Sequence, residues 1–167
     1  MRWTLALLAA LLAPPAAAQS VLAPNGVQAS DMVRTADVVT WRVRAERARP
    51  GASARLVLDA QIAPGWRLYA MGSPVGIPLT LTLDPLPAGV TRGRAAQSAT
   101  RTAFDPAFGL DYPYFSGTAR VVQRVRVAAG AARGTREVTG SVRYAVCDDR
   151  VCLPPTQTAF RVPLAVE

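Results

Sequence analysis

The 167-residue sequence contains no histidine and no lysine, and it has only two cysteines, Cys147 and Cys152. Without histidine the chain cannot form a Ser-His-Asp or Cys-His catalytic centre, and it cannot offer an imidazole ligand to a metal ion. Conventional hydrolase chemistry is therefore not expected. The two cysteines are the residues on which a chemical function would most readily rest.

Long apolar runs are absent except at the N-terminus. Arg2 precedes an apolar run from Leu5 to Leu12, and small residues follow at 16–18. This is the pattern of a secretory signal peptide, and the run is too short to span a bilayer. We predict a signal peptide over residues 1–18, cleaved near Ala18. The mature chain is expected in the periplasm or outside the cell, not embedded in a membrane.

All 19 basic residues are arginine, and the formal net charge is +8. The arginines are scattered, as in R-V-R at 42–44, and mostly alternate with apolar residues. Such alternation places them on the exposed face of strands. A nucleic-acid interface would need a basic patch with interleaved aromatic residues, so no nucleic-acid partner is predicted. A positive surface could still steer acidic partners.

Period-two alternation dominates the sequence after Val38. Fourteen prolines and twelve glycines separate runs of roughly five to ten residues, which is typical of strands joined by turns. The apolar positions that stay in step are Val39, Trp41, Val43 and Ala45; Leu56, Leu58, Ala60 and Ile62; Leu79, Leu81 and Leu83; Val121, Val125 and Val127; Val138, Val142, Tyr144 and Val146; and Phe160, Val162, Leu164 and Val166. We predict an all-β fold, an immunoglobulin-like antiparallel β-sandwich over residues 38–167, preceded by a lead-in over 19–37.

The two cysteines have the spacing Cys-x4-Cys. This is neither the C-x-x-C of thioredoxin-like proteins nor a paired zinc spacing. Two thiolates are too few ligands for structural zinc, and Asp148 and Asp149 would mix hard donors with soft ones. Copper(I) is the metal that two thiolates would suit best, so a copper-handling module stays open as an alternative. We otherwise expect no resident metal and no cofactor.

An exported chain with two cysteines is expected to form a disulfide. Closing a loop this short stabilises a fold by only about 2 kcal/mol in the chain-entropy model, against about 4.7 kcal/mol for a loop of roughly a hundred residues. A bridge this local constrains little of the unfolded chain, which favours chemistry modestly. From the residues alone, a structural and a redox-active disulfide both remain open.

The residues around the pair bear on its reactivity. Leu153 is held extended by Pro154 and Pro155, so Cys152 should lie on a stiff segment with few backbone donors. Asp148 and Asp149, opposed by Arg150, give a local charge of −1. That charge disfavours a thiolate unless the fold moves the carboxylates away. A pair that a partner reduces easily is therefore expected, not a strongly activated nucleophile.

Three segments resemble one known family. They are Y-A-V-C-D-D-R-V-C-L-P-P at 144–155, G-W-R-L-Y at 65–69 and F-D-P-A-F-G at 104–109. They resemble the N-terminal periplasmic domain of the DsbD family of thiol:disulfide interchange proteins, and the resemblance covers roughly residues 35–167. It implies an immunoglobulin-like sandwich that acts as a protein-disulfide reductase. Electrons would arrive from a transmembrane or thioredoxin-like thiol donor and pass to periplasmic isomerases or cytochrome c maturation factors.

The resemblance also implies roles for individual residues. Cys152 would form the mixed disulfide with partners and Cys147 would resolve it. Phe108, or Phe104 if the alignment slips, would cover the pair as an aromatic cap. Asp105 would border the cap, and Tyr69 would lie close to the sulfurs.

The sequence departs from the family at three points. The cysteines are one residue closer than in well-known members, Arg67 stands where an aromatic residue often lies, and the family's transmembrane and thioredoxin-like parts do not follow in this chain. The domain is therefore expected to use separate partners. The alternative function is a non-catalytic secreted module for binding or assembly, with a structural disulfide.

Overall fold

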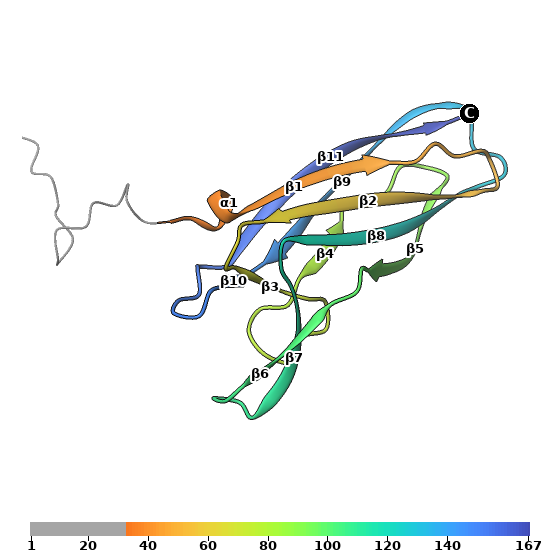
Figure 1. Cartoon of the computed structure of the whole chain (residues 1–167). Helices are drawn as coiled ribbons and strands as arrows, with labels where there is room; N and C mark the ends of the chain where they lie inside the picture. Colours follow the sequence, from red (N-terminus) through yellow and green to blue (C-terminus); the bar gives the residue numbers. More distant parts are fainter. Residues whose placement is uncertain (1–32) are drawn as a thin grey trace, which may run out of the picture. The chain divides into compact units, whose positions relative to one another are not determined.

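The computed structural model describes residues 33–167, and its strands form three antiparallel sheets (Figure 1). The first sheet, in spatial order, contains β1 (Val39–Ala45), β2 (Ser53–Ile62), β8 (Thr118–Val127) and β5 (Val90–Gln97). The second contains β11 (Thr156–Val166), β9 (Gly134–Tyr144) and β4 (Thr80–Leu83). The third contains β10 (Val146–Cys147), β3 (Arg67–Tyr69), β7 (Leu110–Phe115) and β6 (Arg101–Asp105).

One helical turn, α1 (Thr35–Val38), precedes β1. The predicted signal peptide and most of the predicted lead-in lie outside the described residues.

The first two sheets face each other as the layers of a sandwich, and β1 and β11 lie side by side (Figure 1). The backbone of Ala48 bridges that of Val166 between these layers. Apolar side chains of both sheets form the core between them, including Leu58 and Val121 of one sheet and Val142 of the other. The prediction of an immunoglobulin-like antiparallel β-sandwich is confirmed. Within residues 33–167, no helix is both long and apolar enough to cross a membrane.

The strands predicted from period-two alternation are present with the predicted faces inward. In β2, Leu56, Leu58, Ala60 and Ile62 are buried while Arg55 and Gln61 are exposed. The pattern works because one face of each strand meets the opposite sheet and the other meets water. Gln123 of β8 is the exception, since it is fully buried on the apolar face and its Nε2 donates to the carbonyls of Gly93 and Arg124.

Five strands were not predicted: β3, β5, β6, β7 and β10. The run predicted to continue through Val146 is interrupted at Ala145, so β9 ends at Tyr144 and β10 contains only Val146 and Cys147. The other four strands lack a clean alternation. β3 has only three residues, and β7 contains Pro113. β5 is exposed along most of both faces and has a bulge between Arg92 and Ala95. β6 lies at the edge of its sheet and pairs only with β7. Such strands bury too little apolar surface to leave a periodic signal.

The third sheet positions the cysteines. Leu68, Phe115, Val146 and Leu153 are buried in the same cluster as the core of the sandwich, so the base of this sheet is fixed by packing. The β6–β7 hairpin extends away from the two larger sheets (Figure 1). The cysteine loop therefore follows a packed strand, while the hairpin tip does not share the main core.

Candidate redox site at the cysteine loop

Cys147 and Cys152 form a disulfide that closes a short loop after β10. β10 pairs with β3, which places Cys147 opposite Arg67. The two cysteines are unequally exposed, because Cys147 is buried at 8% exposure whereas Cys152 is exposed. An attacking thiol can thus reach the sulfur of Cys152 more readily than the sulfur of Cys147.

Asp148 shapes the loop between the cysteines. Its carboxylate accepts hydrogen bonds from the backbone N–H groups of Arg150 and Val151, both at 2.7 Å, and its own N–H donates to the carbonyl of Val151. The bonds from Val151 and Arg150 hold the pKa of Asp148 below its usual 3.8. The negative charge of the Asp148 carboxylate is therefore stabilised by N–H groups of the same turn.

Asp149 is paired with an arginine from another strand. The guanidinium of Arg67 donates to the Asp149 carboxylate at 2.6 Å and lies 5.5 Å from the centroid of the Tyr114 ring. Arg67, which departs from the family pattern, thus connects Asp149 in the cysteine loop to Tyr114 in β7. Because Asp148 and Asp149 are both engaged, the local negative charge that disfavours a Cys147 thiolate is partly offset.

Tyr69, which the resemblance placed close to the sulfurs, lies beside Cys147 in the structure. Its hydroxyl is 3.4 Å from Sγ of Cys147. A disulfide sulfur carries no proton, so the tyrosine is the donor in this contact. Burial raises the pKa of Tyr69 above its usual 10.0, and Tyr112 and Asp105 add to that rise. The phenol therefore stays protonated and able to donate at neutral pH.

Gly76 fixes the position of the Tyr69 ring. A Cβ at Gly76 would overlap the ring atoms, and the backbone has a φ of +67°, which favours glycine. Gly76, Ile77 and Tyr69 line a hollow of about 320 Å³ together with both cysteines and the segment Leu153–Pro155. The disulfide is thus one wall of a small, open and largely apolar concavity.

The proline segment after Cys152 is held from two sides. The N–H of Leu153 donates to the carbonyl of Val146, and the Leu153 side chain is buried. The hydroxyl of Thr35 in α1 donates to the carbonyl of Pro154 at 2.9 Å, and Thr35 is only 4% exposed. The stiffness predicted for this segment therefore also depends on a contact from the lead-in that precedes β1.

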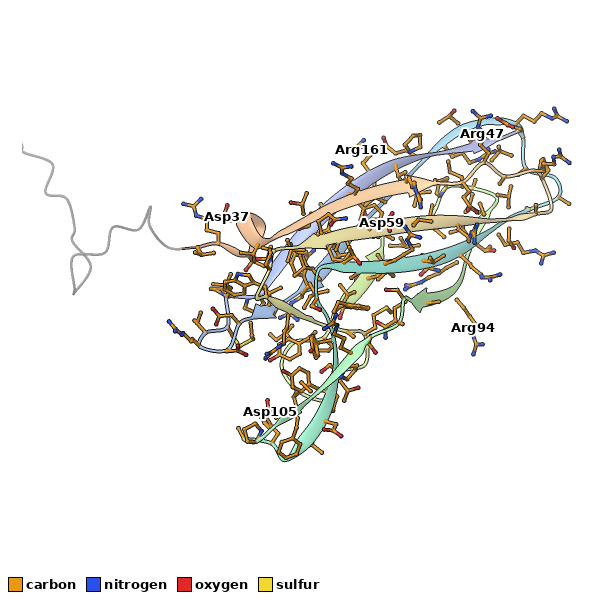
Figure 2. All side chains as sticks on the ribbon, in the orientation of Figure 1. Asp37, Arg47, Asp59, Arg94, Asp105 and Arg161 are labelled. Carbon is orange, nitrogen blue, oxygen red and sulfur yellow. A yellow bond between two sulfur atoms is a disulfide. The ribbon has the colours of Figure 1, made fainter. Side chains whose placement is uncertain are left out.

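The structure does not bring the two candidate cap residues onto the disulfide. Phe104 and Phe108 are 62% and 67% exposed near the tip of the β6–β7 hairpin, and among the described residues neither lines the hollow beside the sulfurs. Asp105 accepts hydrogen bonds from the N–H groups of Ala107 and Phe108, so it shapes this tip, where Figure 2 labels it. The charge of Asp105 contributes to the raised pKa of Tyr69.

Sequence reasoning missed four contributors to the site: Arg67 as a partner of Asp149, Asp148 as an acceptor within the turn, Gly76 and Thr35. For Asp148 a local signal existed, since aspartate commonly accepts from N–H groups two residues on. The contacts of Thr35 and Arg67 join segments far apart in the sequence, so no local pattern indicated them. Gly76 lies in the turn-rich segment between β3 and β4, where a glycine signals a turn but does not reveal its contact with the Tyr69 ring.

An immunoglobulin-like sandwich that presents one half-accessible disulfide beside a tyrosine hydroxyl has the features expected of a thiol–disulfide exchange domain. The family model for the N-terminal part of thiol:disulfide interchange protein DsbD matches residues 36–164. The chain belongs to this family. Among curated proteins, no sequence matches it significantly.

Two solved structures share the fold at low sequence identity. The N-terminal domain of DsbD from Neisseria meningitidis, in its reduced form, is 19% identical with a TM-score of 0.54, over 83% of this chain and 95% of that chain. The N-terminal periplasmic domain of ScsB from Proteus mirabilis is 14% identical with a TM-score of 0.51, over 78% of this chain and 47% of that chain.

Proposed function

We propose that this chain is a periplasmic domain that relays electrons between a membrane-linked thiol donor and periplasmic protein disulfides through Cys147 and Cys152. The unequal exposure of the two cysteines is the observation that carries the proposal. It gives each cysteine a separate task. Family membership supports the class of reaction.

Reduction of the domain begins at Cys152. A thiolate of the donor attacks Sγ of Cys152, the Cys147–Cys152 bond breaks, and Cys147 leaves as a thiolate. A second thiolate of the donor then attacks the donor sulfur that is bonded to Cys152, forms a disulfide within the donor and releases the Cys152 thiolate. The donor is now a disulfide, and the domain has gained two electrons and, from solvent, the protons of its thiols.

Transfer to an acceptor runs through the same sulfurs. The Cys152 thiolate attacks a disulfide of the acceptor protein, and one acceptor sulfur leaves as a thiolate. Cys147 then attacks Sγ of Cys152, re-forms the internal disulfide and releases the second acceptor thiolate. The acceptor, an isomerase or a cytochrome c maturation factor by family resemblance, ends as a dithiol.

Tyr69 supports the step in which Cys147 carries charge. Its hydroxyl already points at Sγ of Cys147, and a hydrogen bond to a thiolate is stronger than one to a neutral sulfur. Arg67 acts on the loop by engaging Asp149, which keeps that carboxylate from the leaving sulfur. Tyr69 is thus proposed to stabilise the leaving group, and Arg67 to act as a positioning residue.

The hairpin tip is proposed to be the movable cover. Phe108 or Phe104 would swing over the hollow beside the disulfide when no partner is present. β6 has a sheet neighbour on one side only, so movement of the tip breaks few contacts.

Trapping of mixed disulfides tests the assignment of roles. Cys147→Ser leaves Cys152 without its resolving thiol, so it should accumulate covalent adducts with donor and acceptor proteins in a periplasmic extract. Cys152→Ser is the matched control and should accumulate few adducts, since its remaining thiol is buried. Equal trapping by the two variants would reverse or remove the assignment.

The reduction potential of the Cys147–Cys152 pair distinguishes a redox-active disulfide from a structural one. Titration with glutathione should give about −180 to −270 mV, the range of proteins that exchange disulfides. A potential below about −300 mV would mark a structural disulfide. The chain would then be a binding or assembly module on the same fold.

A further inference from the structure

A hollow on the first sheet contains no cysteine. It encloses about 730 Å³ over β5, β8 and the start of β2. Its lining includes four arginines, Arg92, Arg94, Arg124 and Arg126, together with the hydroxyl residues Ser53 and Thr91. We call this feature the arginine hollow. Figure 2 shows the Arg94 side chain projecting from β5, apart from the hairpin that carries Asp105.

The backbone opens the arginine hollow at a bulge in β5. The pairing of β5 with β8 shifts register between Arg92 and Ala95, and Gly93 lies within the shift. A Cβ at Gly93 would come within 3.1 Å of the Arg124 Cβ and of its carbonyl oxygen. Gly93 does not have a positive φ, so it is glycine because of space and not because of backbone conformation.

The ladder brings the donors of the arginine hollow together. Arg126 is paired with Ser53 on one side and Thr91 on the other, and Arg124 lies two residues along the same strand face. Arg92 is paired with the buried Val125, and one of its nitrogens donates to the carbonyl of Leu81 in β4. Its side chain therefore lies on the face of the first sheet that meets the other layer, and the donors over the hollow come from Arg94, Arg124 and Arg126. Guanidinium and hydroxyl groups are the donors that recognise phosphate oxygens.

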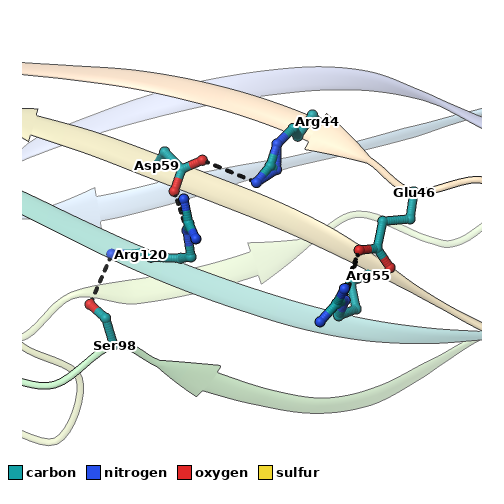
Figure 3. A network of polar contacts seen from close by, with 6 residues as sticks. All are labelled: Arg44, Glu46, Arg55, Asp59, Ser98 and Arg120. Carbon is teal, nitrogen blue, oxygen red and sulfur yellow. Dashed lines mark hydrogen bonds and ion pairs between the residues drawn. The ribbon is translucent and has the colours of Figure 1, made fainter.

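A second hollow on the same face of the first sheet also contains arginines, but carboxylates neutralise their charge. It is lined by Arg42, Arg120 and Asp59. Asp59 forms ion pairs with Arg120 and Arg44, and Glu46 pairs with Arg55 close by (Figure 3). The arginine hollow has no such carboxylate in its lining, and within residues 33–167 none of its four arginines forms an ion pair.

We propose that the arginine hollow is a binding site for phosphate-bearing anions. Arg94, Arg124 and Arg126 bring three like charges to one concavity, and these charges repel one another. A multiply charged anion would remove that repulsion and would receive bidentate hydrogen bonds from the guanidinium groups. Phosphate groups of a free compound and of a phospholipid headgroup share this chemistry.

This site is separate from the disulfide. The arginine hollow and the hollow beside the sulfurs share no lining residue. Anion binding would therefore leave Cys152 accessible, so the domain could hold a phosphate group on one face while it exchanges disulfides at another. The proposal does not depend on the redox assignment and would stand if the disulfide proved structural.

Calorimetric titration with pyrophosphate at constant ionic strength tests the proposal. The variant Arg124→Gln/Arg126→Gln should bind at least about tenfold more weakly than the unmodified domain, because it loses charge-assisted hydrogen bonds. The variant Arg133→Gln/Arg143→Gln removes the same charge from other exposed positions and should bind nearly as the unmodified domain does. Gly93→Ala changes no charge and should also weaken binding by obstructing the arginine hollow.

A second experiment, with lipid vesicles, distinguishes free phosphate compounds from phospholipid headgroups as the ligand. Co-sedimentation with vesicles of phosphatidylglycerol and phosphatidylcholine, compared with phosphatidylcholine alone, reports binding to headgroups. Binding to pyrophosphate alone assigns the site to free phosphate compounds, and binding to anionic vesicles that Arg124→Gln/Arg126→Gln abolishes assigns it to headgroups. Absence of binding in both arms, or equal loss in the two double variants, would overturn the proposal.

Discussion

The hydroxyl of Tyr69 lies 3.4 Å from Sγ of Cys147, although 78 positions separate the two residues in the sequence. The pairing of β3 with β10 produces this contact by setting Leu68 opposite Val146. Gly76 then holds the ring from the other side. Sγ of Cys147, which would leave as a thiolate, therefore has a hydrogen-bond donor beside it before the disulfide is reduced.

Replacing Tyr69 by phenylalanine should make the disulfide harder to reduce. The hydrogen bond stabilises a Cys147 thiolate more than a disulfide sulfur, so its loss should lower the reduction potential by about 20–40 mV, which corresponds to about 1–2 kcal/mol. The rate of reduction by a small thiol should fall as well. Both are measured by quantifying free thiols in glutathione buffers.

Tyr114→Phe is the control for this change. Tyr114 belongs to the same aromatic group, and its ring centroid is 6.0 Å from that of Tyr112. Among residues 33–167, the tyrosine hydroxyl in contact with a sulfur belongs to Tyr69 and not to Tyr114. The Tyr114→Phe variant should keep the potential of the unmodified domain. A Tyr69→Phe potential equal to that of Tyr114→Phe would show that the phenol does not support the thiolate.

The turn between the cysteines should weaken in acid. Backbone N–H donors lower the pKa of Asp148 in the folded state, so its contribution to stability is complete above the unfolded value and is lost as the pH falls through the folded value. The amide proton shifts of Arg150 and Val151, followed by nuclear magnetic resonance, should titrate with a midpoint below 3.8. Asp148→Asn should abolish that titration while Asp149→Asn retains it. A midpoint at or above 3.8 would contradict the hydrogen bonding of this turn.

The sandwich could be predicted from sequence because its long strands bury one face each. In β11, for instance, Val162, Leu164 and Val166 are buried in step between exposed Arg161 and Pro163. The third sheet could not be predicted in this way, because β3 and β6 are short and the β6–β7 hairpin is largely exposed. Alternation in a sequence reveals which residues of a strand are buried. β3 and β6 are defined mainly by backbone hydrogen bonds to neighbouring strands, which leave no such pattern.

The site was predictable where chemistry is specific to a residue type. Two cysteines in an exported chain indicate a disulfide, and family resemblance placed Tyr69 near it. Neither consideration indicated that Arg67 would engage Asp149, or that the carbonyl of Pro154 would need Thr35. Both contacts join segments more than eighty positions apart, so they follow from tertiary structure alone.

Thr35→Val should loosen the segment that follows Cys152. Valine keeps the shape of threonine but removes the donor to Pro154, and the only other bond to that carbonyl among the described residues is a 3.5 Å contact from Thr156. The free energy of unfolding should fall by about 1–2 kcal/mol, as for a buried hydrogen bond whose acceptor is left poorly paired. Urea denaturation measures the change. Thr40→Val, at an exposed position in β1, should have little effect on the midpoint.

The hairpin tip provides the test of the proposed cap. If Phe108 closes over the hollow in the absence of a partner, Phe108→Ala should speed alkylation of the reduced pair by iodoacetamide severalfold, because the cover is gone. Leu110→Ala removes another exposed apolar side chain of the same hairpin and should leave the rate unchanged. A faster rate for Phe104→Ala alone would move the cap to Phe104. Unchanged rates in both phenylalanine variants would mean that the disulfide has no aromatic cover, and that the exposed position of both side chains is their resting position.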